Sequence, residues 1–255
     1  MLIREPICAI VVETNQVESL NHNKLAAAMD PKNQPAWWNL GIAATALGDW
    51  KTARQAWRGF GIDVPDGDGP LDLPAGYCPI RLHPDGEAEV VWARRIDPAR
   101  AVLASIPFPE SGFRWGDTVL NDGAATGYRI YGGQEFPVFN ALELLEVSLL
   151  GTFLARVKMP EGSDCITKLA RYAEDAGGAA EDWSMSVQLL CKACSEGRPH
   201  EAHDTLKKPA DDIHLIGIAV RNAEQAEHLI ARWRSEFLEI QVESMQEMLA
   251  PAKGD

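Results

Sequence analysis

Two cysteines and two histidines lie close together in the C-terminal third of this sequence. Cys191 and Cys194 are separated by two residues, and His200 and His203 follow after a turn. A Cys-x-x-Cys knuckle presents both sulfurs to one point, and two imidazoles complete a tetrahedral ligand set of the kind that zinc prefers. Four protein ligands leave no open position for a reactive water. The pattern therefore predicts a structural zinc site that staples the loop 191–203.

Three other interpretations of this Cys/His loop stay open. The cysteines can be core thiols at the end of a strand, followed by two solvent-exposed histidines. They can be a redox pair, although nothing around them resembles thioredoxin. If one of the four ligands were absent, the site would be a catalytic metal centre with Glu196 or Glu201 as its general base.

The remaining candidates for chemistry have simpler structural explanations. His83 lies in a turn before Pro84, His214 in an apolar strand, and His228 on the exposed side of a helix. The acidic pair Glu181-Asp182 is expected on a solvated loop edge. The sequence contains no nucleophile elbow, phosphate-binding glycine loop, His-Glu-x-x-His motif or dinucleotide fingerprint.

The N-terminal quarter carries a helical-hairpin pattern in which small residues alternate with aromatic ones. The pattern consists of Trp37, Leu40, Gly41, Gly48, Ala53, Trp57, Phe60 and Pro65. Small residues are needed where two helices cross closely, and aromatic residues fill the space between them. Residues 34–67 thereby resemble one full repeat of the tetratricopeptide (TPR) family, and residues 24–31 resemble a degenerate half repeat. Ala44 departs from the family, which has a large aromatic residue at this position.

The resemblance also implies a binding face. In the TPR family the inner face of the first helix receives ligand peptides, and the matching positions here are Trp38, Ile42 and Thr45. These side chains are apolar or neutral, unlike the basic set with which the family clamps a peptide carboxylate. We therefore expect an apolar contact, made either with an amphipathic helix of a partner or with this protein's own β-module. Because one hairpin is too short to be stable alone, the second alternative is slightly favoured.

The rest of the chain divides by composition and period. Residues 1–65 form the helical region, and residues 66–79 are a linker or ordered loop rich in Pro, Gly and Asp. The aspartates at 63, 66, 68 and 72 invite a calcium interpretation, but they lack the spacing and the terminal glutamate of an EF-hand. Residues 80–146 contain short β-type runs separated by Pro- and Gly-rich turns, which predict a small antiparallel, SH3-like β-module. In this module we expect Asp117 to cap a turn.

Residues 147–255 alternate between strand and helix patterns. We expect strands at 152–159, 183–190, 213–220 and 237–242, and helices at 163–176 and 222–234. The order β-α-β, insertion, β-α-β is that of a ferredoxin-like βαββαβ domain, with the Cys/His loop in the insertion. The predicted fold class is therefore α+β, built from three modules.

Composition limits the kinds of partner. The 255 residues include 24 Lys plus Arg and 37 Asp plus Glu, a net charge of −13. No segment concentrates basic residues, which argues against nucleic-acid binding, and no apolar run is long enough to cross a membrane. Five cysteines without a secretion signal indicate reduced thiols and a cytoplasmic location.

Together these features predict a non-enzymatic protein–protein interaction or adaptor protein. A specific form of this hypothesis is an inhibitor or immunity-type protein that neutralises a basic partner. The alternative is a metal-dependent enzyme of the hydrolase class that uses the Cys/His loop. The sequence leaves the partner and the oligomeric state open.

Overall fold

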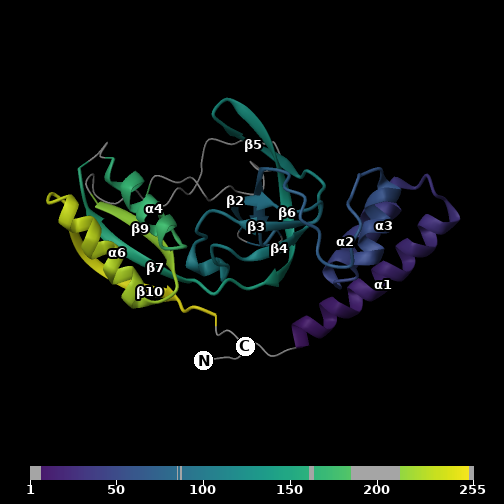
Figure 1. Ribbon diagram of the computed structural model, residues 1–255, viewed down its shortest axis with the longest axis horizontal. Helices are drawn as coiled ribbons and strands as arrows, with labels where there is room; N and C mark the ends of the chain where they lie inside the picture. The colour runs from purple at the N-terminus through teal and green to yellow at the C-terminus, as the bar shows by residue number, and fades with distance from the viewer. Residues whose placement is uncertain (1–6, 85, 87, 161–163, 185–212, 253–255) are drawn as a thin grey trace.

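The computed structural model describes residues 7–84, 86, 88–160, 164–184 and 213–252. They form a mixed α+β protein in which helices, a β-barrel and an α/β sheet follow one another along the chain (Figure 1). The predicted fold class, α+β, is confirmed at this level. Within the described part of the chain, no helix has the length and apolar character needed to span a bilayer.

Three helices form the N-terminal region: α1 (Ile7–Met29), α2 (Gln34–Ala46) and α3 (Trp50–Phe60). The side chains of Asn33 and Asp49 cap α2 and α3 by accepting hydrogen bonds from backbone N–H groups at Ala36 and Thr52. The two helices cross closely at Gly41, where an added Cβ atom would lie 2.5 Å from the ring of Trp57. Only glycine permits this approach.

The segment after α3 is an ordered loop. The Arg54 guanidinium, which is buried, donates hydrogen bonds to the carbonyl oxygens of Pro65 and Gly69 at 3.0 and 2.7 Å. Arg100 donates to the Leu71 carbonyl at 2.6 Å and pairs with the buried Asp97 carboxylate at 2.6 Å. Two buried arginines therefore fix a segment that has little apolar surface of its own.

Six strands follow: β1 (Tyr77–Leu82), β2 (Glu89–Arg95), β3 (Arg100–Leu103), β4 (Thr118–Asn121), β5 (Gly127–Tyr131) and β6 (Gln134–Glu146). Antiparallel pairing runs β1-β2-β3-β4-β6, and a parallel pairing of β1 with β6 closes a five-stranded barrel. An odd number of alternating strands leaves the first and last pointing the same way, so the closing pair has to be parallel. β5 pairs with β6 as a hairpin that extends from the barrel (Figure 1).

The barrel core consists of inward-facing residues that alternate along the strands. It contains Cys78, Ile80, Leu82, Val91, Ala93, Ala101, Leu103, Val119, Phe139 and Ala141. A short 3-10 turn, η1 (Pro109–Ser111), lies between β3 and β4. Asp117 caps the turn before β4, as expected, because its carboxylate accepts hydrogen bonds from Arg114 N and Ser148 N at 2.7 Å each.

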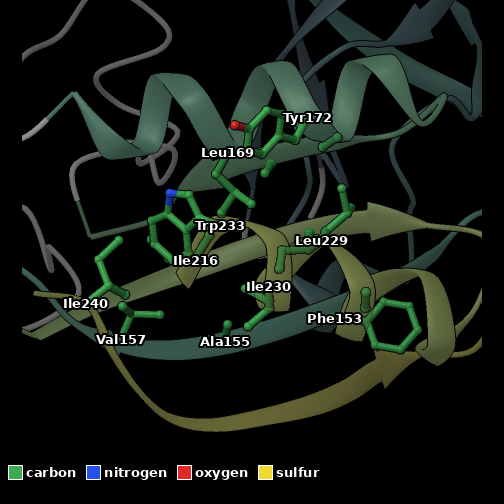
Figure 2. Packing of buried hydrophobic residues seen from close by; sticks show 14 of the residues in the cluster. Phe153, Ala155, Val157, Leu169, Tyr172, Ile216, Leu229, Ile230, Trp233 and Ile240 are labelled. Atoms are coloured by element: carbon green, nitrogen blue, oxygen red, sulfur yellow. The ribbon is translucent and has the colours of Figure 1, made fainter. Parts of the chain in front are cut away.

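The C-terminal part contains β7 (Gly151–Lys158), α4 (Cys165–Asp175), β8 (Ala179–Asp182), β9 (Ile213–Val220), α6 (Ala223–Glu236) and β10 (Gln241–Leu249). Its four strands pair antiparallel in the order β10-β7-β9-β8. Both helices cover one face of this sheet, with Trp233 and Leu169 packed over Val157 and Ile216 (Figure 2). The Asn222 side chain caps α6 by accepting from Gln225 N, as the sequence predicted.

Two strands in this part differ from the predicted ones. β8, at Ala179–Asp182, precedes the strand expected at 183–190; Trp183 and Ser184 are in the turn after β8, and residues 185–190 lie outside the described residues. Gly178 permits the early start, because a Cβ atom there would lie 2.1 Å from the Ala219 carbonyl oxygen. The strand expected at 237–242 is β10 at Gln241–Leu249, where two register shifts interrupt the period-2 pattern.

Apolar clusters join the three parts. The helices pack on the barrel through Ile42, Trp57, Ala99 and Leu120, which belong to one buried cluster. The barrel packs on the uncovered face of the C-terminal sheet through a second cluster that contains Ile106, Leu150, Trp183 and Ala219. Trp183 lies against Gly217 and donates from Nε1 to the Ile106 carbonyl at 3.1 Å. This second contact, between barrel and sheet, contains the candidate site.

Candidate functional site

Two of the three residues predicted to bind a partner, Trp38 and Ile42, contact the protein's own barrel. Ile42 is 8% exposed, and Thr45 is buried, with 2% exposure. Trp38 donates from Nε1 to the Asp122 carbonyl oxygen at 2.8 Å, and its ring lies where a Cβ atom of Gly123 would be. These contacts are of the kind expected if the hairpin packs on this protein's own β-module and not on a partner's helix. The four predicted zinc ligands, Cys191, Cys194, His200 and His203, lie outside the described residues.

The contact between barrel and sheet is organised by a short segment after β3, residues 105–108. Ser105 N donates to the Trp92 carbonyl oxygen of β2 at 3.1 Å, whereas the N–H groups of Ile106 and Phe108 need side-chain acceptors. Ile106 N donates to the carboxylate of Glu181 on β8 at 3.2 Å. Phe108 N donates to both carboxylate oxygens of Glu89, the first residue of β2, at 3.1 Å each. One glutamate therefore comes from each side of the contact.

Both carboxyl groups have raised pKa values. Burial raises the pKa of Glu89 to about 8, the Phe108 N–H opposes the shift, and the negative charges of Glu110 and Glu181 add to it. Burial likewise raises the pKa of Glu181 to about 7, opposed by hydrogen bonds from Ile106 N and the Ser105 hydroxyl. Desolvation disfavours the charged form of a carboxylate, which is why both groups titrate close to neutral pH.

A first cavity, here called the aromatic pocket, opens between the barrel and β8. Its volume is about 510 Å³, and it is lined by Tyr77, Trp92, Ala104, Ser105, Tyr131, Phe136 and Glu181. The Trp92 ring packs edge-on against Tyr131 and Phe136, with centroid distances of 5.5 and 5.0 Å. The Arg129 guanidinium lies 5.4 Å from the centre of the Trp92 ring. The pocket thus joins aromatic surface to one carboxylate.

A second cavity, here called the sheet pocket, is lined by Phe108 at the other end of segment 105–108. Its volume is about 330 Å³. Its lining residues are His83, Glu89, Phe108, Pro109, Glu110, Ser111, Leu154, Trp183, Leu215 and Met248. The apolar wall comes from the uncovered face of the sheet, and the polar side comes from the barrel.

Next to the aromatic pocket, Asp182 of β8 and His214 of β9 form a buried acid–imidazole pair. His214 Nδ1 lies 2.6 Å from the Asp182 carboxylate, and the other oxygen of Asp182 accepts from Ser184 N. The prediction that His214 lies in a strand is confirmed, and its imidazole has the Asp182 carboxylate as a partner. The expectation of a solvated loop edge at Glu181-Asp182 is wrong, because both residues belong to a strand that packs against the barrel and both accept internal hydrogen bonds.

Among the described residues, no cluster of three or more His, Cys, Asp and Glu side chains has the geometry to hold an ion. The barrel–sheet contact instead offers carboxylates beside aromatic and aliphatic surface. Such an arrangement suits cations that carry hydrocarbon, or proton transfer by a group that titrates near pH 7.

Sequence reasoning did not single out Glu89 or the aromatic pocket. The available signal was an acidic residue directly before an apolar strand, in the run Ala88-Glu89-Val90-Val91. A charged residue in that position either faces solvent or is held by a specific donor, and the sequence does not show which of these applies. The donor, Phe108 N, is 19 residues away along the chain.

Comparisons with known proteins add little to this geometry. No protein-family model matches the chain, and neither does any curated protein. Among solved structures, a hypothetical protein from Neisseria gonorrhoeae aligns with 70% of this chain and 96% of its own, at 9% sequence identity and a TM-score of 0.29. A similarity at this level carries no statement about shared fold or function.

Proposed function

We propose that this chain is a non-enzymatic interaction protein that receives a basic side chain of a partner protein in its aromatic pocket. The observation that carries the proposal is the position of Glu181 among the rings of Tyr77, Trp92 and Tyr131. Aromatic faces attract cations through their quadrupole, and a partly buried carboxylate adds a charge that is weakly screened.

The charge of the whole molecule supports a basic partner. With a net charge of −13, the protein attracts positively charged macromolecules that come within about a Debye length of its surface. The Arg129 guanidinium beside Trp92 is an internal example of the same contact between a cation and this ring. An inhibitor or immunity-type role, in which the partner is a basic toxin or nuclease, is one form of this function.

The architecture supports the proposal as a scaffold for binding. We infer that α2 and α3 form a TPR-type hairpin, because Gly41 and Trp57 make the close crossing that the repeat requires. We infer an SH3-like barrel from the closed meander, and a ferredoxin-like domain from the strand order β10-β7-β9-β8. These folds serve many functions, so the assignment rests on the pocket and not on them.

An enzyme is the second candidate. Its support is Glu89, a buried carboxyl group with a pKa of about 8 beside a cavity, which is a suitable general acid near neutral pH. The metal-dependent form of this hypothesis would place the metal at Cys191, Cys194, His200 and His203. A purely structural role, in which Glu89 accepts the Phe108 N–H, accounts equally well for its burial beside the cavity. We therefore rank the enzyme second.

The deciding experiment compares two tyrosines on β5. Tyr131 and Tyr128 are 65% and 58% exposed, but their side chains leave opposite faces of the strand, and only Tyr131 lines the aromatic pocket. Binding of a fluorescent oligolysine peptide is measured by anisotropy for the wild type and for Tyr131→Ala, Glu181→Gln and Tyr128→Ala. An oligoglutamate peptide is the control ligand.

We expect Tyr131→Ala and Glu181→Gln each to weaken binding about fivefold to thirtyfold, as the loss of a cation–π or charge contact predicts. Tyr128→Ala should bind as the wild type does. Equal weakening by all three variants would indicate non-specific attraction to the acidic surface and would contradict the proposal. A pull-down from native lysate with the same variants then identifies the natural partner.

A further inference from the structure

The sheet pocket combines two kinds of surface that rarely meet by chance. On one side it presents Trp183, Leu154, Leu215 and Met248, which come from the C-terminal sheet and the turn after β8. On the other side it presents the carboxyl groups of Glu89 and Glu110. Its volume of about 330 Å³ lies within the range of small-molecule sites.

Glu89 is the group that gives this cavity its chemistry. The side chain is only 3% exposed, and its oxygens accept one backbone N–H, from Phe108. Carboxylate oxygens offer about four acceptor positions, so a single shared donor leaves room for a ligand that donates. A buried carboxylate with spare acceptor positions is best satisfied by a cation.

The charges around the cavity favour a positive ligand. Burial is the main cause of the raised pKa of Glu89, and the charges of Glu110, which lies at the cavity's surface, and of Glu181 add to it. A cation placed between these groups would relieve the repulsion and favour ionised Glu89. His83 also lines the cavity, but its Nε2 lies 2.7 Å from the Ser111 carbonyl oxygen, which can only accept, so this nitrogen is the donor.

We propose that the sheet pocket binds a small alkylammonium ion, with its hydrocarbon chain against Leu154, Trp183 and Leu215 and its ammonium group facing Glu89 and Glu110. The ammonium group supplies three hydrogen-bond donors to carboxylates that have few donors around them, and the ligand's hydrocarbon chain removes apolar surface from water. This site is separate from the aromatic pocket and goes beyond the function proposed above.

The first test is a series of ligands measured by isothermal titration calorimetry on the full chain. The probes are ethyl-, butyl- and hexylammonium, with hexanol and hexanoate as matched compounds of the same chain length. We expect affinity to rise about threefold to fourfold for each added methylene, as burial of hydrocarbon predicts. Hexylammonium should bind at least tenfold more tightly than hexanol, and hexanoate should bind most weakly.

Two kinds of variant separate the polar and the apolar contributions. Glu89→Gln keeps an oxygen that accepts from Phe108 N, and it should abolish the preference for hexylammonium over hexanol. Met248→Trp and Leu215→Trp fill the cavity from two different strands, and each should abolish binding of both. Because either tryptophan could disturb folding, circular dichroism and thermal unfolding decide which variant is used.

A third readout is independent of affinity. Because the ammonium ion favours ionised Glu89, binding near pH 7 should release a proton, which appears as a dependence of the binding enthalpy on the buffer's ionisation enthalpy. This dependence should vanish in Glu89→Gln. The Tyr131→Ala variant should bind hexylammonium normally, which distinguishes this site from the aromatic pocket.

Three results would overturn the proposal. Equal affinities for hexylammonium and hexanol would show that the carboxylates do not contribute to recognition. Equal affinities along the alkyl series would show that the apolar wall does not contribute. An absence of measurable binding at millimolar ligand would show that the sheet pocket is not an alkylammonium site. This result would leave the proposal for the aromatic pocket, which the oligolysine experiment tests, unaffected.

Discussion

Glu89 and Glu181 hold the same short segment, since Glu181 accepts from Ile106 N and Glu89 from Phe108 N. Glu89 belongs to the barrel and Glu181 to the C-terminal sheet. The segment lines both cavities, the aromatic pocket through Ser105 and the sheet pocket through Phe108. The contact between these two parts of the chain therefore depends on two carboxyl groups that titrate near neutral pH.

The first prediction concerns the pH dependence of stability. The folded-state pKa of Glu89 is about 8, above its ordinary value of 4.5, so between these pH values the folded state binds more protons than the unfolded state. The free energy of unfolding should therefore fall as pH rises from about 4.5 to about 8. Glu181, with a pKa of about 7, contributes in the same direction up to that pH.

The measurement compares denaturant unfolding of the wild type and of Glu89→Gln at pH 5 and pH 8.5. Relative to the wild type, the variant should gain stability at the higher pH, by up to a few kcal/mol. Glu110, Glu181 and His83 also face this region, so only the difference between the two proteins is interpreted. Glu174→Gln, at an exposed position on α4, is the control and should show no such gain.

The second prediction tests the helical crossing. In Gly41→Ala, the new methyl group would lie 2.5 Å from the buried ring of Trp57, so the helices have to separate. We expect a loss of about 1–3 kcal/mol of unfolding free energy, in the range for overpacked cores. Gly69→Ala is the matched control, because nothing lies within 4 Å of its added Cβ atom. Similar stability of both variants would contradict the crossing.

The third prediction concerns the ion pair of Arg100 and Asp97. The two side chains are 6% and 1% exposed, and Arg100 also fixes the Leu71 carbonyl and lies over the Trp50 ring at 4.8 Å. Arg100→Ala leaves a buried carboxylate without its cation and should cost about 3–5 kcal/mol. The double variant Arg100→Met/Asp97→Asn should recover part of this loss. A double variant less stable than the single one would argue against charge burial as the cause.

The fourth prediction concerns zinc and rests on the sequence. If Cys191, Cys194, His200 and His203 form a closed ligand set, the untagged protein should carry about one equivalent of zinc, measured by elemental analysis. Cys194→Ser should lose the metal and destabilise the C-terminal part. A preparation with less than about a tenth of an equivalent would refute the site. In the catalytic alternative, the same substitution would leave the fold largely intact.

The sequence was sufficient to predict the type and bounds of elements with strong periodic patterns. The helix after Asn222 was predicted at 222–234, and its observed bounds are Ala223–Glu236. The strand predicted at 213–220 is β9, with the same bounds. In both cases local information was complete, because a capping side chain or an unbroken apolar run determines the element without help from distant residues.

The candidate site could not be predicted in this way. Segment 105–108 meets Glu89 and Glu181 only because the barrel packs on the sheet, and these partners are 19 and 75 residues away along the chain. β8 was misplaced for a related reason. Its start depends on contact between Gly178 and the Ala219 carbonyl, which no pattern in Ala179-Ala180-Glu181-Asp182 reveals. Tertiary contacts therefore decide what the local sequence leaves open.

The parallel pairing that closes the barrel has a consequence for the order of events during synthesis. Ile80 pairs with Phe139, so one edge of β1 remains unpaired until a further stretch of roughly sixty residues has left the ribosome. The helices, and the buried barrel residues Ala99 and Leu120 that pack on them, are complete before that. Nascent chains halted before β6 would therefore expose the free edge of β1. Such chains should be strong substrates for chaperones, whereas chains extended past β6 should not.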